Sequence, residues 1–196
     1  MRGFFITGTD TGVGKTVVSA MLSILMLERG FNVSVRKPIE TGCDTQTLIP
    51  KDGLFLKQIT GSAESLDVIT PVRLRSPLAP LVAADLDGTT IDVEALIKSL
   101  CGIDSSCVAV VEGVGGLVVP IARQFFVSDL IKALGLPAIL VSANRLGTIN
   151  HTLLSLEHML NKGITVAGIV FNNNCVADPS YHKPLVYAVE PAFGLN

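Results

Sequence analysis

The sequence has no tryptophan, few aromatic residues and only four cysteines, with no C-x-x-C pair among them. This spacing excludes a sulfur-ligated zinc site and a thioredoxin-like redox motif. We therefore expect reduced cysteines of a cytosolic protein. The four are Cys43, Cys101, Cys107 and Cys175.

Basic clusters and long apolar runs are also absent. The formal net charge is −2, which gives a nucleic-acid surface no electrostatic support. The longest charge-free stretch, residues 163–177, contains three consecutive Asn and two Gly, whereas a membrane-spanning helix needs about 20 mostly apolar residues. The first ten residues lead into a glycine loop and resemble a strand more than a signal peptide. These features indicate a cytoplasmic protein that binds neither nucleic acid nor membrane.

What the chain does have is apolar content. Its 196 residues are most simply one domain, residues 1–196. The apolar fraction of 48% and the mean hydropathy of +0.54 are high. They indicate strands buried on both faces, together with a covered subunit interface.

Short β-branched runs alternate with helical patterns along the chain. Strands are predicted at residues 3–7, 32–36, 107–113, 137–144 and 165–172, and helices at 15–29, 92–100, 127–134 and 148–162. This order predicts an α/β fold, a doubly wound, mainly parallel sheet with helices on both faces. The proline-rich residues 71–80 are expected to form a surface connection. Ligands of such sheets bind at the carboxyl ends of the strands.

A glycine loop, GTDTGVGKT at residues 8–16, follows the first strand and opens a helix. Its N–H groups and the helix N-terminus would face one anion site. Lys15 would reach the β- and γ-phosphates of a nucleotide, and Thr16 would offer its hydroxyl to Mg²⁺. The loop has five residues between Gly8 and the Gly-Lys-Thr ending, where the usual P-loop has four. An ordinary glycine-rich turn is the alternative.

Two charged residues end further strands. Lys37 is held extended by Pro38 and would point into the ligand crevice, unless it is simply solvated. Glu112 ends an apolar run, where an unpaired carboxylate is costly. Bound Mg²⁺ would account for it, as would a salt bridge. Gly115 lies among glycines that permit close approach of a ligand.

The last two strands end in weaker signals. Residues 147–150 open a helix that could bind an anion through free N–H groups, or could be an ordinary helix start. Asn172 could contact a base edge or begin a turn. His151 and His158 lack the i, i+4 spacing of helical zinc pairs, so no metal role is expected for them.

Together these segments resemble the dethiobiotin synthetase family of P-loop NTPases. The matching stretches occur in the family's order up to about residue 172, and the family's loop has the same five-residue gap. The matches are GTDTGVGKT, KPIETG, PKDGLFL, SPLAPLVAA, VEGVGGLVVP, SDLIKALGLPAILV, LGTINHTLL and AGIVFN.

The resemblance implies roles for individual residues. Lys37, Lys15 and Thr11 would be catalytic. ATP would be held by Gly12, Val13, Gly14, Lys15, Thr16 and Val17, with Asn172 at the adenine. Thr16, Asp52 and Glu112 would bind Mg²⁺. The substrate would lie against Lys37, Thr41 and Gly115, and its carboxylate would meet Gly147, Thr148, Ile149 and Asn150 of the other subunit of a homodimer.

The implied reaction is the ATP-dependent carboxylation of 7,8-diaminononanoate by CO₂ (or bicarbonate) and its closure to dethiobiotin. Two departures from the family occur. Gly12 stands where some members carry an acidic residue, and only 11 residues separate Asn172 from Pro184, where the family has room for another helix. Val189, Glu190 and Pro191 are weak candidates for the nucleobase side.

Three alternatives share parts of this pattern. A regulatory P-loop ATPase of the partitioning or septum-positioning class would have the same fold, but its signature lysine is replaced by Asp10. A cobyrinate-type amidating synthetase would need a further glutamine-hydrolysing domain. A nucleotide-binding module would bind ATP without turnover.

Overall fold

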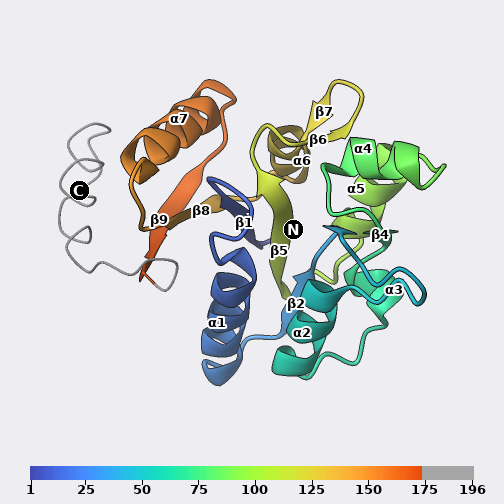
Figure 1. Cartoon of the computed structure of the whole chain (residues 1–196). Helices are drawn as coiled ribbons and strands as arrows, with labels where there is room; N and C mark the ends of the chain where they lie inside the picture. The colour runs from blue at the N-terminus through green and yellow to red at the C-terminus, as the bar shows by residue number, and fades with distance from the viewer. Residues whose placement is uncertain (174–196) are drawn as a thin grey trace.

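The computed structural model describes residues 1–173 and has a parallel sheet at its centre (Figure 1). Within these described residues, the sheet has five strands in the order β2-β5-β1-β8-β9, and every neighbouring pair is parallel. These strands are β1 (Gly3–Gly8), β2 (Val33–Arg36), β5 (Val108–Gly116), β8 (Ala138–Ala143) and β9 (Val166–Asn172). All five strands expected from the sequence are present, and the doubly wound parallel sheet is confirmed.

Helices cover both faces of this sheet, because successive strand residues point to opposite sides. Phe5 packs in a core with buried residues of α5 (Val93–Cys101), α6 (Val127–Leu134) and α7 (Thr148–Asn161). Its neighbour Ile6 packs in a second core with α1 (Lys15–Glu28), α2 (Lys51–Thr60) and α3 (Leu66–Ile69). Figure 1 shows α1 and α2 side by side on one side of the sheet, with α6 and α7 on the other.

The four predicted helices begin and end close to their expected bounds. Gly14 (φ 98°) precedes α1, and Gly30 (φ 80°) follows it in the left-handed region that favours glycine. Asp92 caps α5, its side chain accepting a hydrogen bond from the Ala95 N–H at 2.8 Å. Gly135 (φ 63°) ends α6.

Shorter elements were not expected from the sequence. β3 (Ile39–Thr41) pairs in parallel with β4 (Val72–Leu74), and β6 (Pro120–Ala122) pairs with β7 (Phe125–Phe126). The expectation of a surface connection at residues 71–80 is therefore wrong in part. Leu74 of β4 is buried against Ala83 and Ala84 of α4 (Pro80–Leu86). Three residues between the prolines are enough to form the paired strand β4.

Within residues 1–173, none of the helices is both long and apolar enough to cross a lipid bilayer. Cys43, Cys101 and Cys107 are free thiols, and Cys175 lies outside the described residues.

Candidate functional site

A cavity of about 720 Å³ lies at the carboxyl ends of β1, β2 and β5. Its position agrees with the general rule that ligands of open α/β sheets bind outside these strand ends. Eleven of the residues predicted from the sequence line it: Thr11, Gly12, Gly14, Lys15, Thr16, Val17, Lys37, Thr41, Asp52, Glu112 and Gly115. Glu40, Val114, Val119 and residues 77–80 complete its wall.

The glycine loop forms one side of the cavity and leads directly into α1. Gly12 (φ 74°) and Gly14 (φ 98°) adopt the left-handed backbone that the turn requires. The Lys15 ammonium folds back over the loop and donates a hydrogen bond to the Asp10 carbonyl oxygen at 2.9 Å. This geometry gives the loop the strand-to-helix context of a phosphate-binding site.

Lys15 is almost fully buried at the edge of the cavity. Burial, followed by the positive charge of Lys37, lowers the pKa of Lys15 to about 8, against the opposing effect of Glu112 and Asp52. An anion bound in the loop would favour the charged form and raise that pKa again.

Glu112, in the middle of β5, is the centre of the charged cluster and has no exposed surface. Its Oε1 accepts hydrogen bonds from the Lys37 ammonium at 2.6 Å and from the Thr16 hydroxyl at 2.9 Å. Lys37 also lies 3.1 Å from Asp52 Oδ2 and donates to the Gly113 carbonyl oxygen at 3.3 Å. The structure thus brings together four separate segments at one point.

The two carboxylates keep Lys37 charged despite its burial. Burial alone would lower the pKa of Lys37, but Glu112 and Asp52 together outweigh it, and the pKa is raised. Lys37 is therefore a fixed cation at the floor of the cavity at any physiological pH.

The same cluster contains oxygen donors suited to a hard divalent cation. Glu112 Oε2 is buried and has no hydrogen-bond partner among the described residues, and the Thr16 hydroxyl and the Asp52 carboxylate are close by. No group of three or more His, Cys, Asp or Glu side chains in residues 1–173 could hold a metal by itself. Such an open oxygen set fits Mg²⁺, which takes one or two carboxylates and completes its shell with water and phosphate oxygens.

Glu40, in β3, was not singled out from the sequence. Its carboxylate is buried and accepts hydrogen bonds from the N–H groups of Asp52 at 2.9 Å and Gly53 at 3.0 Å. Burial raises the pKa of Glu40, while the two N–H donors oppose that rise. One signal in the sequence points to such a residue. Pro50, which precedes α2, has no side-chain acceptor for a helix cap, so an acceptor from elsewhere in the chain is needed.

Other predicted residues lie outside this cavity. Val13 is buried in the core beside Ile6, so that only its backbone faces the loop. Asn172, at the end of β9, donates a hydrogen bond from its amide to the Val13 carbonyl oxygen at 3.0 Å. The amide lies so close to the loop that a Cβ at Gly14 would come within 2.2 Å of it.

The predicted carboxylate site at the start of α7 is also separate from the cavity. Gly147 (φ 92°) precedes the helix, and Thr148 is buried, with its hydroxyl donating to the Ala143 carbonyl oxygen. Ile149 and Asn150 are exposed. Val189, Glu190 and Pro191 lie outside the described residues.

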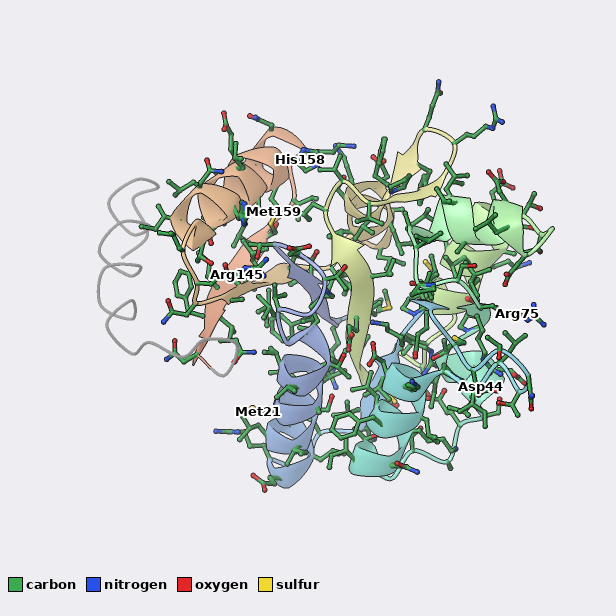
Figure 2. The ribbon with its side chains drawn as sticks, viewed as in Figure 1. Met21, Asp44, Arg75, Arg145, His158 and Met159 are labelled. Carbon is green, nitrogen blue, oxygen red and sulfur yellow. The ribbon has the colours of Figure 1, made fainter. Side chains whose placement is uncertain are left out.

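A salt bridge joins the loop to the approach to α7. Arg145 lies 2.7 Å from the Asp10 carboxylate, and Figure 2 shows Arg145 beside the base of α7. At the other end of that helix, His158 contacts Ser128 of α6 at 3.0 Å. His158 thus ties two helices together and contributes nothing to the charged cluster.

Comparisons with known proteins agree with this geometry. A family model described as an AAA domain matches residues 2–191. A putative plasmid partition protein from Borrelia burgdorferi, solved with bound AMPPNP, has a similar fold, with a TM-score of 0.53, 11% identity, and coverage of 97% of this chain and 82% of that one.

Two curated relatives are much more similar in sequence, and both are named ATP-dependent dethiobiotin synthetase BioD. The relative from Thermodesulfovibrio yellowstonii is 44% identical over 87% of this chain and 75% of its own length. The relative from Methanocaldococcus jannaschii is 42% identical over 90% of this chain and 81% of its own length. With the P-loop cavity described above, these matches show that the chain belongs to the dethiobiotin synthetase family.

Proposed function

We propose that this chain catalyses the ATP-dependent conversion of 7,8-diaminononanoate and CO₂ to dethiobiotin, ADP and phosphate. The observation that supports this most directly is the meeting of Lys15, Lys37 and Glu112 around one cavity at the P-loop. The identity of 44% to a named dethiobiotin synthetase supports it independently.

The chemistry needs charge and orientation more than covalent help. One amine of the substrate adds to CO₂ and loses a proton, which gives a carbamate. A carbamate oxygen then attacks the γ-phosphorus of ATP, and ADP leaves. The second amine attacks the carbamoyl carbon, and the bond from this carbon to the phosphate oxygen breaks, so that phosphate leaves with the electron pair. Loss of a proton completes the cyclic urea.

The chain's residues match these demands. Lys15 and Lys37 offset negative charge on the transferred phosphoryl group. The N–H groups from Gly12 to Val17 hold the polyphosphate, with Val13 contributing backbone alone. Thr11, Thr41 and Gly115 lie in the cavity wall. There Thr11 would contact phosphate, and Thr41 and Gly115 would contact the reacting end of the substrate. Such orientation can lower a barrier by about 7–11 kcal/mol.

Mg²⁺ is the divalent ion that we propose for this site, held by Thr16, Asp52 and Glu112. When bound with nucleotide, it would neutralise charge on the phosphate oxygens. Replacement Glu112→Gln should raise the Mg²⁺ concentration needed for half-maximal turnover. An unchanged requirement would show that Glu112 is not a ligand.

The working form is proposed to be a homodimer, in which residues 147–150 of one subunit receive the substrate carboxylate of the other. Leu146 is 86% exposed, and Ile149 and Leu154 are also exposed, so an apolar surface surrounds this helix start. The first N–H groups of a helix have no intrahelical partner and suit an anion.

Asn172 is proposed to contact the adenine. Its amide already lies against the loop that would carry the phosphates, so a modest change of its side chain would bring it to a base. Replacement Asn172→Ala should weaken ATP binding more than it weakens binding of inorganic triphosphate.

The proposed reaction is tested by mixing the protein with Mg·ATP, bicarbonate and the diamine. We expect ADP release that depends on the diamine, with the cyclic urea detected by mass spectrometry. ADP release without this dependence would instead indicate a regulatory ATPase. ATP binding with no turnover would indicate a binding module.

A further inference from the structure

The start of α2 is held by a residue from another part of the chain. The side chain of a Ser, Thr, Asp or Asn at the N-cap can accept a hydrogen bond from the first turn of a helix, but Pro50 occupies that position here. Glu40 supplies the missing acceptors from β3, and its two oxygens take the N–H groups of Asp52 and Gly53 separately. A carboxylate at this end of a helix also interacts favourably with the helix dipole.

A second contact fixes the same turn from the other side. Gly53 packs so closely on Thr70 that a Cβ at position 53 would lie 2.0 Å from the Thr70 hydroxyl oxygen. Thr70 is itself completely buried. The first turn of α2 is therefore confined between Glu40, which holds it by hydrogen bonds, and Thr70, against which it packs.

This confinement determines where the Asp52 carboxylate lies. The backbone N–H of Asp52 is bound by Glu40, while its Oδ2 is 3.1 Å from the Lys37 ammonium. Asp52 is half exposed at the cavity wall, so burial of its own side chain does not hold it in place. The position of its backbone does.

We propose that Glu40 is a positioning residue, which holds the Asp52 carboxylate at the metal-binding edge of the cavity by capping α2. Both Glu40 oxygens accept backbone N–H groups at the start of α2, and through this contact Glu40 would act on Asp52. This inference rests on the proposed function for the identity of the ion at Asp52. The contacts of Glu40 with the start of α2, and of Asp52 with Lys37, do not depend on which reaction is catalysed.

The test compares Glu40→Gln with Asp92→Ala, which removes the matched cap of α5 far from the cavity. Loss of a residue that orients a metal ligand typically costs about 10–100-fold in metal affinity. We therefore expect Glu40→Gln to raise the half-saturating Mg²⁺ concentration by about 10-fold or more, with a smaller effect on kcat at saturating metal. Asp92→Ala should lower thermal stability and leave the Mg²⁺ requirement unchanged.

Two readouts do not depend on turnover. Binding of Mn²⁺ to the protein–ADP complex, followed by electron paramagnetic resonance, should weaken in Glu40→Gln to the same extent. Amide hydrogen exchange at residues 52 and 53 should become faster. These measurements remain informative even if the wild-type protein shows no diamine-dependent turnover, which would refute the proposed function alone.

Two further variants complete the test. Gly53→Ala displaces the same turn from the Thr70 side, so it should raise the Mn²⁺ and Mg²⁺ requirements even if Glu40→Gln folds poorly. Adding Glu40→Gln to Asp52→Asn should cause no further loss of metal affinity, since Glu40 acts through Asp52. Unchanged metal binding in folded Glu40→Gln, or full additivity with Asp52→Asn, would overturn the proposal.

Discussion

Glu112, in the middle of β5, has no exposed surface, whereas Leu146, beyond the end of β8, is 86% exposed. The contrast extends to their surroundings. On the β5 side, Lys37 and Glu112 are buried and already paired with each other. On the β8 side, the predicted carboxylate site is a helix start with exposed residues Ile149 and Asn150.

This difference separates two kinds of site. In the half that we propose for phosphate and metal, Lys37 and Glu112 are paired within one chain, because buried charges are costly when unpaired. The half that would receive the far end of the substrate is open, and it suits a contact that a second subunit completes. Five experiments examine this division, from the largest expected effect to the smallest.

Lys37→Met should cause the largest loss. Removal of one cation that stabilises the transferring phosphoryl group should lower kcat by about 10²–10³-fold. It also strands buried Glu112, which should reduce the free energy of unfolding by about 3 kcal/mol. The double variant Lys37→Met/Glu112→Gln should recover stability in urea unfolding without recovering turnover. The control is Lys132→Met, which changes a lysine on the exposed surface of α6. Near-normal turnover of Lys37→Met would show that Lys37 is not part of the site.

Ile149→Pro tests the open half. Proline is tolerated in the first turn of a helix but removes one N–H donor. Loss of a hydrogen bond to a carboxylate should raise KM for the diamine by about 10–100-fold, while Ile149→Ala, which keeps the donor, should have little effect.

The same variant tests whether the two halves come from different subunits. When Ile149→Pro is mixed and re-equilibrated with Lys37→Met, roughly a quarter of wild-type activity should return. Half of the randomly formed dimers are hybrids, and each hybrid carries one intact site out of two. Absence of any recovery, with hybrid dimers demonstrated by mass spectrometry, would place both halves in one subunit.

The pKa of Lys15 predicts a smaller, pH-dependent effect. Because burial lowers this pKa to about 8, the unliganded protein loses the ammonium charge as the pH rises above that value. ATP favours the charged form, so binding must take up a proton there. Affinity should fall by about tenfold for each pH unit above the pKa, and calorimetry in buffers of different ionisation enthalpy should detect the uptake. A flat affinity between pH 7 and 9 would contradict the assignment.

Arg145→Ala should have the smallest effect, although its salt bridge with Asp10 links the two halves. Both side chains are about half exposed, and such pairs contribute only about 0–1 kcal/mol. ATP affinity should change by no more than about fivefold, and less at high salt. A tenfold loss would instead make Arg145 part of the nucleotide site.

The sequence predicted the fold well, because it records the order of strands and helices directly. Alternation of β-branched runs with helical patterns was sufficient for the five-stranded sheet, and the rule for strand ends placed Lys37 and Glu112 in the crevice. Asp52 followed only from the family resemblance, since nothing in its local pattern distinguishes it from a solvated helix residue.

Glu40 and the wall at residues 77–80 could not be predicted in this way. Both depend on the parallel pairing of β3 with β4, which joins segments 33 positions apart through strands of three residues. Such short strands carry no measurable periodicity. The roles of Asn172 and of residues 147–150 stay predictions, because they depend on ligands or on a second subunit.

Asn172, near the end of the described residues, contacts the glycine loop near their beginning. The Asn172 amide fills the volume beside Gly14 that any larger residue would occupy. The N-terminal loop consequently takes its lateral support from β9, the last strand within residues 1–173. A nascent chain would have this loop before it had the support, so competence to bind nucleotide should arise only once β9 has joined the sheet.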